Sequence, residues 1–430
     1  MVGDKLIDIG SIIKLQRTKR NMTQEELSEG IVSLSYLSKI ENKKTKASPE
    51  IIQLLCNRLE IELTEKLDVE IEEKCQEWYG MLYDRFDKQK ISEIYEELQQ
   101  LLGRSINDQT LMFEIHKIRY YCIMRDLKKA LCKINELHEM ASSFNPIHKY
   151  YWHKFQGNYY SFKTYHHQAI QHYKLAEEII SFANIQEHET ADLQYIISIE
   201  HSKLWNDLES IEYAKKAMGI FQKNYNFIRC AQCHILLGIA HHRIKNLDKA
   251  TKNYNLALQL GELKNNEDVV HLAHYNLGYL HSITGNSEKA IEHYLIAIQN
   301  NNFKEKTKLV SLIRLIQEFY LVGDYKKAKN YLDQTTLVLK TYINDYNEYT
   351  DDLHDYVIKV YTHLLNGETK QFISVLANDF IPYLEKKRNY EYLAFYAKML
   401  GNHLEKSGKY KTSLQYYKLA NSSYEKLFNL

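Results

Sequence analysis

The chain has 430 residues, of which 44% are hydrophobic and 26% are charged, with 56 Lys and Arg against 55 Asp and Glu. The nearly neutral balance excludes a highly charged nucleic-acid coat or an acidic tail. Only 3 Pro and 15 Gly occur, too few for the turns of a β-sandwich or a Rossmann-type sheet. The composition therefore predicts an almost entirely helical globular protein with short polar turns.

The sequence shows no membrane or export segment. No run of 18 apolar residues is present, and Met1 to Gly10 has charges at Asp4, Lys5 and Asp8 with no apolar region after them. The six cysteines are dispersed, which is typical of free thiols in a reducing compartment. We therefore expect a cytoplasmic protein that does not bind membranes.

Short helices are predicted throughout the first sixty-five residues. Apolar spacing predicts a helix from Ile9 to Arg20, and Thr23-Gln24-Glu25-Glu26 is a capping box that begins a second helix. After a tight turn Ser33 caps a third helix, Leu34 to Asn42, and Ser48-Pro49 begins a fourth. Two short helices joined by a tight turn, within a bundle of about five, are the helix-turn-helix pattern.

Residues 9 to 62 resemble the lambda-repressor/Xre-type helix-turn-helix family. Three blocks match in register: T-Q-E-E-L, V-S-x-S-Y-L-S-K-I-E-N and S-P-x-x-x-x-x-L. In that family the start of the third helix enters the major groove of DNA. The resemblance also implies a structural ion pair between Arg17 and Glu41. It implies base contacts by Leu34, Ser35, Tyr36 and Lys39 and phosphate contacts by Gln24, Lys43, Lys44 and Lys46.

The charge of this segment leaves an alternative open. Residues 1–65 contain ten Lys and Arg and ten Asp and Glu, so the segment is neutral overall, with its basic residues at 14–20 and 39–46. The alternative is an interaction module that has lost DNA binding. Because one helix-turn-helix touches too few base pairs to select a site, DNA binding predicts a homodimer or higher oligomer on a pseudo-palindromic operator.

An internal repeat occupies the rest of the chain. A recurring position, mostly a small residue, is followed by bulky residues and returns every 38 to 43 residues. The nine centres are Ile91, Ala130, Ala169, Ser210, Ala250, Ala290, Ala328, Gln371 and Ser413. Such a period predicts a solenoid of stacked helical hairpins. We therefore expect an all-α fold with a DNA-binding domain at 1–65 and a repeat domain at 66–430.

The clearest units resemble the tetratricopeptide repeat, lengthened from 34 to about 40 residues by longer helices. In ILLGIAHHRIKNLDKATKNYNLAL and YNLGYLHSITGNSEKAIEHYLIAI, the Gly of a Leu-Gly pair stands twelve residues before the small Ala. The resemblance implies a right-handed superhelical solenoid of about nine hairpins, in which most tyrosines serve packing. The second helix should cross the first closely at Gly157, Gly238, Gly278 and Gly401.

The concave face of such a solenoid is lined by the first helix of each hairpin. Counting from the Leu-Gly pairs places nine polar residues on it: Arg119, Asn158, Tyr275, Asn276, Tyr279, Arg314, Gln317, Lys398 and Asn402. Amide side chains can bond both C=O and N–H of an extended peptide, and cationic side chains can bind a carboxylate. These residues are therefore candidates for peptide binding.

A helix-turn-helix followed by such repeats over the whole chain resembles the RRNPP family of Gram-positive quorum-sensing receptors, and is most similar to its NprR type. The resemblance implies a transcriptional regulator switched by a short signalling peptide in the repeat groove. In this family an Asn of a central Y-N-L-G helix holds the peptide backbone, and Asn276 matches it. Two alternatives remain: a Rap-like protein that binds a response regulator and inhibits phosphotransfer, and a ligand-independent repressor or scaffold.

No catalytic, metal or cofactor site is expected. Cys230-Ala231-Gln232-Cys233-His234 matches a haem-attachment string, but haem attachment requires export, and both cysteines fall in a predicted repeat helix. A zinc site is not predicted either, because the sequence has no second pair of ligands at a suitable spacing. Walker, G-x-G-x-x-G, G-x-S-x-G and H-E-x-x-H motifs are all missing from the sequence. We therefore predict a protein that is not an enzyme.

Overall fold

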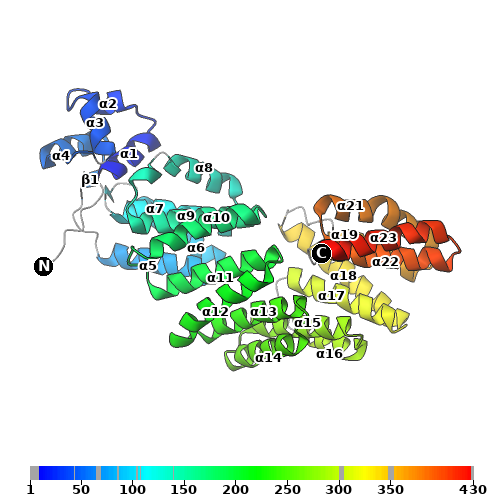
Figure 1. Ribbon diagram of the computed structural model, residues 1–430. Coiled ribbons are helices and arrows are strands. Elements are labelled where there is room, and N and C mark those ends of the chain that lie inside the picture. The colour runs from blue at the N-terminus through cyan, green and yellow to red at the C-terminus, as the bar shows by residue number, and fades with distance from the viewer. Residues whose placement is uncertain are drawn as a thin grey trace. The chain divides into compact units, whose positions relative to one another are not determined.

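Almost all of the described chain is helical, as the composition predicts (Figure 1). The structure, a computed structural model, describes residues 9–42, 44–63, 69–84, 87–102, 105–106, 108–138, 140–299, 305–346 and 353–427. Its contacts divide the chain into two compact units, unit 1 from Met1 to Leu204 and unit 2 from Trp205 to Leu430. No helix among these residues is both long and apolar enough to cross a membrane.

Unit 1 contains the helix-turn-helix segment and the first repeats. Its elements are α1 (Ile9–Lys19), α2 (Gln24–Ser28), α3 (Leu34–Glu41), α4 (Pro49–Arg58), β1 (Glu62–Leu63), α5 (Val69–Asp84), α6 (Lys88–Leu102), β2 (Ser105–Ile106), α7 (Asp108–Ile123), α8 (Leu127–His138), the 3-10 turn η1 (Ala141–Ser143), α9 (Pro146–Phe162), α10 (His166–Ile180) and α11 (Glu187–Lys203). The two-residue strands β1 and β2 pair in parallel.

Unit 2 is entirely helical over its described residues. Its elements are α12 (Asp207–Lys223), α13 (Phe227–Arg243), α14 (Leu247–Leu263), α15 (Glu267–Ile283), α16 (Ser287–Ile298), α17 (Glu305–Leu321), α18 (Tyr325–Tyr346), α19 (Leu353–Leu365), α20 (Thr369–Ser374), the π-helical turn η2 (Val375–Phe380), α21 (Ile381–Lys387), α22 (Tyr390–Lys406) and α23 (Tyr410–Leu427).

Consecutive helices pack as the predicted hairpins. Within each unit a first helix contacts its own second helix, as in α9 with α10 and α13 with α14, and also the next first helix, as in α7 with α9. The predicted centres lie on the second helices, and eight of the nine are buried. The exception is Gln371, which is exposed while Phe372 is buried, so the register of that unit is one residue later than predicted.

The four predicted glycines lie where a tyrosine of the second helix crosses the first. A Cβ on Gly238 would lie 2.3 Å from the ring of Tyr254, which is 1% exposed. Gly157 and Gly278 face Tyr173 and Tyr294 in the same way, in each case sixteen residues later, and these buried rings fill the interior of their hairpins. At Gly401 the fit is looser, since a Cβ there would lie 3.1 Å from the partly exposed ring of Tyr417.

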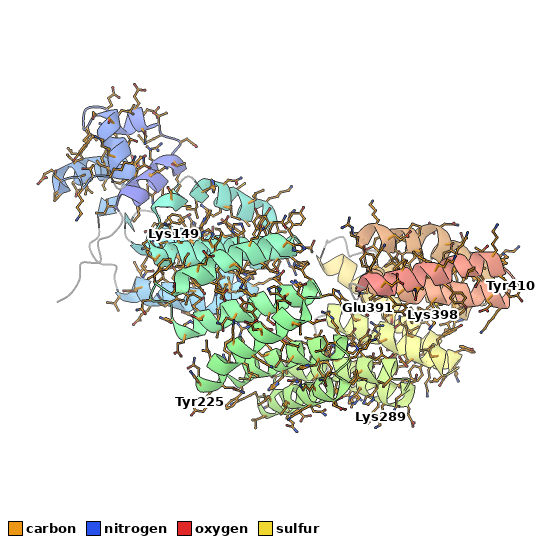
Figure 2. All side chains as sticks on the ribbon, viewed as in Figure 1. Lys149, Tyr225, Lys289, Glu391, Lys398 and Tyr410 are labelled. Atoms are coloured by element: carbon orange, nitrogen blue, oxygen red, sulfur yellow. The ribbon has the colours of Figure 1, made fainter. Side chains whose placement is uncertain are left out.

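The turns between helices show why so few glycines and prolines suffice. In the central repeats an Asn side chain accepts a hydrogen bond from the third amide of the helix that follows, at Asn226, Asn246, Asn266 and Asn286. The residue before each cap adopts positive φ, and only Gly285 among these is glycine; the others are Tyr225 (Figure 2), Lys245 and Asn265.

The helix-turn-helix bundle shares a hydrophobic core with the first repeats. One cluster of buried side chains includes Ile12, Leu37 and Leu55 of the bundle together with Leu111 and Ile115 of α7. The pairing of β1 with β2 also connects the end of the bundle to the segment before α7. The domain boundary at residue 65 stays a prediction, because this core continues across it.

Candidate functional site

The helix-turn-helix has the local geometry that its sequence predicts. The Thr23 hydroxyl accepts from the Glu26 amide at 3.1 Å, and the Thr23 amide donates to the Glu26 carboxylate at 2.6 Å. This capping box starts α2, and the side chain of Ser33 accepts from the Tyr36 amide at the start of α3. Between the two helices Gly30 has a φ of +67°, a conformation that glycine adopts without strain.

Both ends of helix α1 contact the C-terminal end of α3, at Ile40 and Glu41. Arg17 forms two hydrogen bonds with the Glu41 carboxylate, at 2.7 and 3.1 Å, and Glu41 is 1% exposed. At the other end of α1, a Cβ on Gly10 would lie 2.1 Å from the Ile40 carbonyl oxygen. The Arg17–Glu41 pair that the resemblance implied is therefore present, and it fixes the outer helix of the motif.

The predicted DNA contacts lie on or beside α3. Ser35, Lys39, Lys44 and Lys46 are exposed, as is Leu34 at 51%. Tyr36 is half-buried and packs against the core of unit 1. Gln24 donates to the Glu41 carboxylate at 2.6 Å, which leaves its second amide hydrogen for another acceptor. Lys43 lies outside the described residues.

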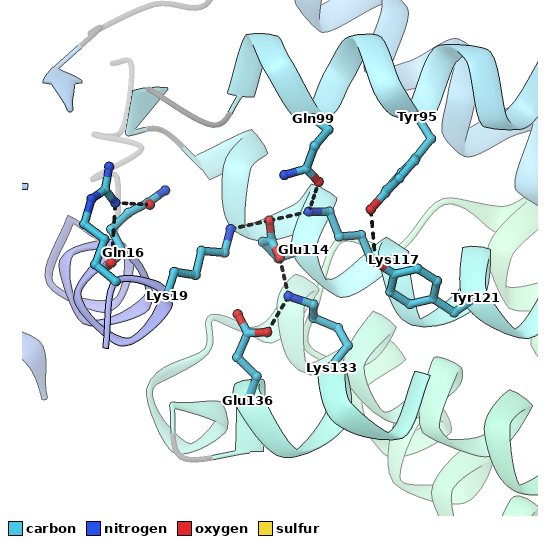
Figure 3. Close-up of polar contacts among 10 residues, drawn as sticks. Gln16, Lys19, Tyr95, Gln99, Glu114, Lys117, Tyr121, Lys133 and Glu136 are labelled. Carbon is cyan, nitrogen blue, oxygen red and sulfur yellow. Dashed lines mark hydrogen bonds and ion pairs between the residues drawn. The ribbon is translucent and has the colours of Figure 1, made fainter. Parts of the chain in front are cut away.

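A buried cluster of charges lies where the bundle meets the repeats (Figure 3). Glu114 of α7 is 2% exposed and is contacted by three ammonium groups. Lys19 of α1 lies at 2.5 Å, Lys117 of α7 at 2.8 Å and Lys133 of α8 at 2.7 Å from its carboxylate oxygens. Lys133 also pairs with Glu136, and Lys117 donates to Gln99. We call these six residues the Glu114 cluster.

The protonation of Glu114 follows from its partners. Burial alone would raise the pKa of its carboxyl, but the three lysines outweigh burial and hold the pKa well below its usual range. Burial lowers the pKa of Lys117 to about 8, against the opposing effect of Glu114. The carboxylate is therefore ionised at neutral pH and serves as the common anion of the cluster.

In unit 2, α15, α17, α22 and α23 enclose a cavity of about 210 Å³. We call it the Arg314 pocket. Its walls are Tyr279, Ser282, Ile283, Arg314, Gln317, Glu318, Leu321, Glu391, Tyr392, Phe395 and Tyr424. Since sites for small ligands measure roughly 300–1,000 Å³, this volume suits one side chain or one end of a peptide.

Arg314 is the only cation among the residues of the pocket wall. Its side chain is 14% exposed, and its guanidinium carbon lies 4.9 Å from the centre of the Tyr279 ring. Nη1 donates to Gln317 at 3.1 Å, whereas Nη2 lies 3.6 Å from the Glu391 carboxylate, longer than a charge-assisted hydrogen bond. Nε has no hydrogen-bond partner in the described part of the chain. Much of its donor capacity is therefore unused.

Two carboxylates and two phenols surround this cation. Glu391 accepts from the Tyr279 hydroxyl at 3.0 Å, and Glu318 accepts from Ser282 while its second oxygen has no partner among the described residues. Burial raises the pKa of Tyr279 and Tyr392, that of Tyr392 to about 12, so both phenols stay protonated at neutral pH. The pocket thus offers both donors and acceptors to a ligand.

The structure brings together three of the predicted groove residues, Tyr279, Arg314 and Gln317, in this pocket. Tyr275 and Asn276 lie on α15 outside its wall, and the Asn276 amide donates to the Leu272 carbonyl at 2.7 Å. The others are apart from it. On α22, Lys398 and Asn402 are exposed and outside the pocket wall, and in unit 1 Arg119 donates to Leu82 while Asn158 donates to Tyr173.

Counting from the Leu-Gly pair missed Glu391, Tyr392, Phe395 and Tyr424. On α22 that count selects the second half of the helix, so it gives Lys398, whereas Glu391 lies two turns earlier (Figure 2). An acid in the first turn of a first helix does not single out Glu391, because α11 and α15 also have acids there. Tyr424 lies on a second helix, α23, for which the pattern gave no signal.

The cysteine string at 230–234 and the scattered histidines form no metal site among the described residues. Cys230 and Cys233 are both buried within α13, the first helix of a repeat. No group of three or more His, Cys, Asp or Glu side chains could hold a metal ion in the part of the chain that the structure describes.

Comparison with known proteins gives matches to both parts of the chain. A family model described as Helix-turn-helix matches residues 13–66. Transcriptional activator NprA of Geobacillus stearothermophilus is 30% identical over 416 residues, which cover 94% of this chain and 100% of that protein. The chain belongs to the RRNPP family. It is therefore a regulator, and it belongs to a family of quorum-sensing receptors, as its sequence predicts.

Solved structures are similar to this RRNPP regulator in fold. The apo form of the quorum sensor NprR from B. thuringiensis has a TM-score of 0.67 and 18% identity, covering 83% of this chain and 99% of that chain. NprR in complex with its cognate peptide NprX has a TM-score of 0.58 and 18% identity, over 82% and 98%. A Rap protein complexed with competence and sporulation factor has a TM-score of 0.66 and 20% identity, over 84% and 99%.

Proposed function

We propose that this protein is a transcriptional regulator that binds double-stranded DNA through α3 and is switched by a short peptide held by the repeat helices. The observation that carries the proposal is an intact helix-turn-helix with an exposed α3 in a chain that aligns end to end with a transcriptional activator. The solved structure of NprR in complex with its cognate peptide NprX, which has a similar fold, supports the choice of ligand.

On DNA, the exposed start of α3 would enter the major groove. Lys39 would donate to guanine, Ser35 to either base type, and Leu34 would contact a thymine methyl, with Tyr36 beside them. The exposed ammonium groups of Lys44 and Lys46 suit phosphates, as does the remaining amide hydrogen of Gln24. Because one such motif reads too few base pairs, a homodimer on a pseudo-palindrome completes the proposal.

Selection of genomic DNA fragments by the purified full-length protein, followed by affinity measurements at several salt concentrations, tests the DNA step. Lys39→Ala should weaken specific binding by about 1–3 kcal/mol and relax one base position. Lys44→Ala should weaken all sequences alike and reduce the salt dependence. Lys289→Ala, on exposed α16, should change neither (Figure 2). An equal loss on specific and random DNA for Lys39→Ala would contradict base reading.

For the peptide, the first helices of unit 2 offer a row of polar groups. The Asn276 amide donates to its own helix, so its carbonyl oxygen can accept from a peptide N–H. Tyr275 lies beside it, and the Arg314 pocket would take a side chain or an end of the same peptide. Lys398 and Asn402 in unit 2, and Arg119 and Asn158 in unit 1, stay predicted peptide contacts, each within its own unit.

Retention of a synthetic pool of random heptapeptides on the immobilised protein tests this step. The wild type should retain a subset of the pool, and Asn276→Ala should retain much less while melting at the same temperature. Asn255→Ala, an exposed Asn on α14, is the matched control. If no peptide is retained while DNA still binds, the ligand-independent repressor replaces the proposal. Binding of a response regulator in place of both ligands would favour the Rap-like alternative.

A further inference from the structure

The Glu114 cluster joins two parts of the chain that have different proposed roles. Of the three ammonium groups on Glu114, Lys117 and Lys133 come from the repeats, and only Lys19 comes from the helix-turn-helix bundle (Figure 3). Lys19 stands at the end of α1, and its side chain is 24% exposed. The bundle therefore contributes one directed, partly buried contact to a site that the repeats otherwise complete.

This contact is directional, as is the short backbone pairing of β1 with β2, whereas the apolar part of the interface is not. The hydrophobic cluster shared by the bundle and α7 to α9 holds the two together, but apolar contact tolerates rotation. A buried carboxylate loses a partner that water cannot replace when its ammonium group moves away. With Lys19 in place Glu114 is 2% exposed, so orientations of the bundle that keep the 2.5 Å contact to this buried carboxylate are favoured.

From Lys19 the path to the DNA-facing helix is short. Arg17, on the same helix, forms two hydrogen bonds with Glu41 at the end of α3. At its other end, α1 crosses the last turns of α3 so closely that Gly10 has no room for a Cβ. Helix α1 thus contacts Glu114 on one side and α3 on the other, and α3 follows any movement of α1.

We propose that Glu114 is a positioning residue, which through Lys19 sets the orientation of the helix-turn-helix bundle on the first helices of the repeats. The bundle is then held at a set angle rather than on a free tether, and α1 carries any displacement of α7 to α3. The inference rests on the proposed function only where α3 is taken to read DNA. In a dimer, two bundles held at set angles would accept only one spacing between half-sites.

Distances between spin labels on the full-length protein test the docking directly. One label goes on Cys132 of α8, which is exposed while the other five cysteines are buried, and the second on Asn57→Cys, exposed on α4. The wild-type background should give one narrow distance distribution. Lys19→Met and Glu114→Gln should broaden it at least about twofold, because only apolar contacts and the two-residue pairing of β1 with β2 then hold the bundle. Lys19→Arg, which keeps the charge, should restore the narrow distribution.

Lys74→Met is the control, since its ion pair with Glu97 joins α5 and α6 within one exposed hairpin. It should leave the distribution narrow. A broad distribution in the wild-type background, or an unchanged one in Lys19→Met, would overturn the inference. If Glu114→Gln fails to fold, Lys19→Met and Lys19→Arg decide between the two outcomes, because Lys19 is partly exposed and Glu114 keeps two lysines.

A second measurement separates this inference from the proposed function. On the selected operator, moving one half-site by about 5 base pairs, half a helical turn, should abolish wild-type binding but be tolerated by Lys19→Met. Equal sensitivity of both proteins to the spacing would overturn the positioning role. If the wild type binds no DNA at all, the proposed function fails, while the label distances still decide the docking.

Discussion

Glu114, which is buried, and Arg314, which is partly exposed, are both charged residues on the first helices of repeats, one in each unit, yet their surroundings differ sharply. Glu114 is 2% exposed and has three ammonium groups within 2.8 Å. Arg314 has its nearest carboxylate at 3.6 Å, an unpartnered Nε in the described structure, and a cavity of about 210 Å³ beside it. The same repeat framework therefore carries one charged residue that is fully paired within the chain and one that is only partly paired.

The difference separates a structural role from a binding role. A charge whose partners come from its own chain stabilises one arrangement of that chain and has nothing left for a ligand. A charged group with unused hydrogen-bond donors next to a cavity can donate them to a ligand. Such a group contributes less to the stability of the fold by itself. We therefore expect Glu114 to govern stability and Arg314 to govern binding, and the following variants test this division from the largest effect to the smallest.

Glu114→Gln should destabilise unit 1 by about 3–5 kcal/mol, because it leaves buried ammonium groups without their anion. Urea denaturation followed by tryptophan fluorescence reports mainly on this unit, since two of the three tryptophans, Trp78 and Trp152, lie in it. Glu97→Gln, which removes an exposed partner of Lys74, should leave the midpoint unchanged. A loss of less than about 1 kcal/mol in Glu114→Gln would contradict a structural role.

His116, two residues from Glu114, should make unit 1 sensitive to acid before the cluster itself titrates. Burial lowers the pKa of this imidazole to about 3, and its ring stacks on Tyr79 at 3.9 Å. The folded-state pKa lies below the unfolded value, so the unfolded chain takes up the proton first as the pH falls below about 6.5. Stability should then fall by about 1.4 kcal/mol per pH unit down toward pH 3.

His116→Phe keeps an aromatic ring in this stack and removes the titration. Between pH 6.5 and 4.5 its unfolding midpoint should change less steeply than that of the wild type. Glu114, whose pKa is also lowered, loses its contribution only below this window, since its unfolded-state pKa is about 4.3. Half-buried His153, whose pKa burial lowers to about 4, leaves a residual slope. Parallel pH profiles for the two proteins would show that His116 is not the sensor.

The filled interior of the hairpins offers a contrast to the open pocket. Gly238→Ala should destabilise unit 2 by about 1–3 kcal/mol, because its Cβ would meet the buried ring of Tyr254 at 2.3 Å. Gly219→Ala, at an exposed position of α12 with nothing within 4 Å, should instead stabilise by about 0.5–1 kcal/mol through helix propensity. Thermal melts of the two variants should therefore shift in opposite directions, and shifts of the same sign would refute the crossing geometry.

Arg314→Met should have the smallest effect on stability, within about 1 kcal/mol of the wild type, because a weakly paired, partly exposed ion is replaced by an apolar side chain of similar length. The matched control is Arg388→Met, at an exposed position after α21. A loss comparable to that of Glu114→Gln would show that Arg314 is part of the fold rather than of a binding site.

The sequence predicts the fold well because its signals are local and repeated. The capping box at Thr23 determines the start of a helix. Small residues such as Ala250 and the Leu-Gly pairs determine where two helices cross, and the structure confirms these predictions. The register fails only near Gln371, where the small residue of the pattern is missing and Phe372 fills the interior.

The pockets and clusters are harder to predict because they depend on residues distant in sequence. Tyr279 contacts Glu391 across 112 positions, and Lys19 contacts Glu114 across 95. A repeat pattern gives the face of a helix on which a residue lies, but not which later repeat approaches it. The pattern therefore found Arg314 and missed Glu391, and it gave no indication that the helix-turn-helix bundle would pair with α7.

The most direct test of the central claim is the DNA affinity of the wild type and of Arg314→Met, each with and without the heptapeptides that the wild type retains. Coupling between two ligands typically changes affinity about 5- to 150-fold. We expect a change in this range for the wild type, and for Arg314→Met an unchanged affinity without peptide and no response to it. An equal response in both proteins, or none in the wild type, would contradict the account.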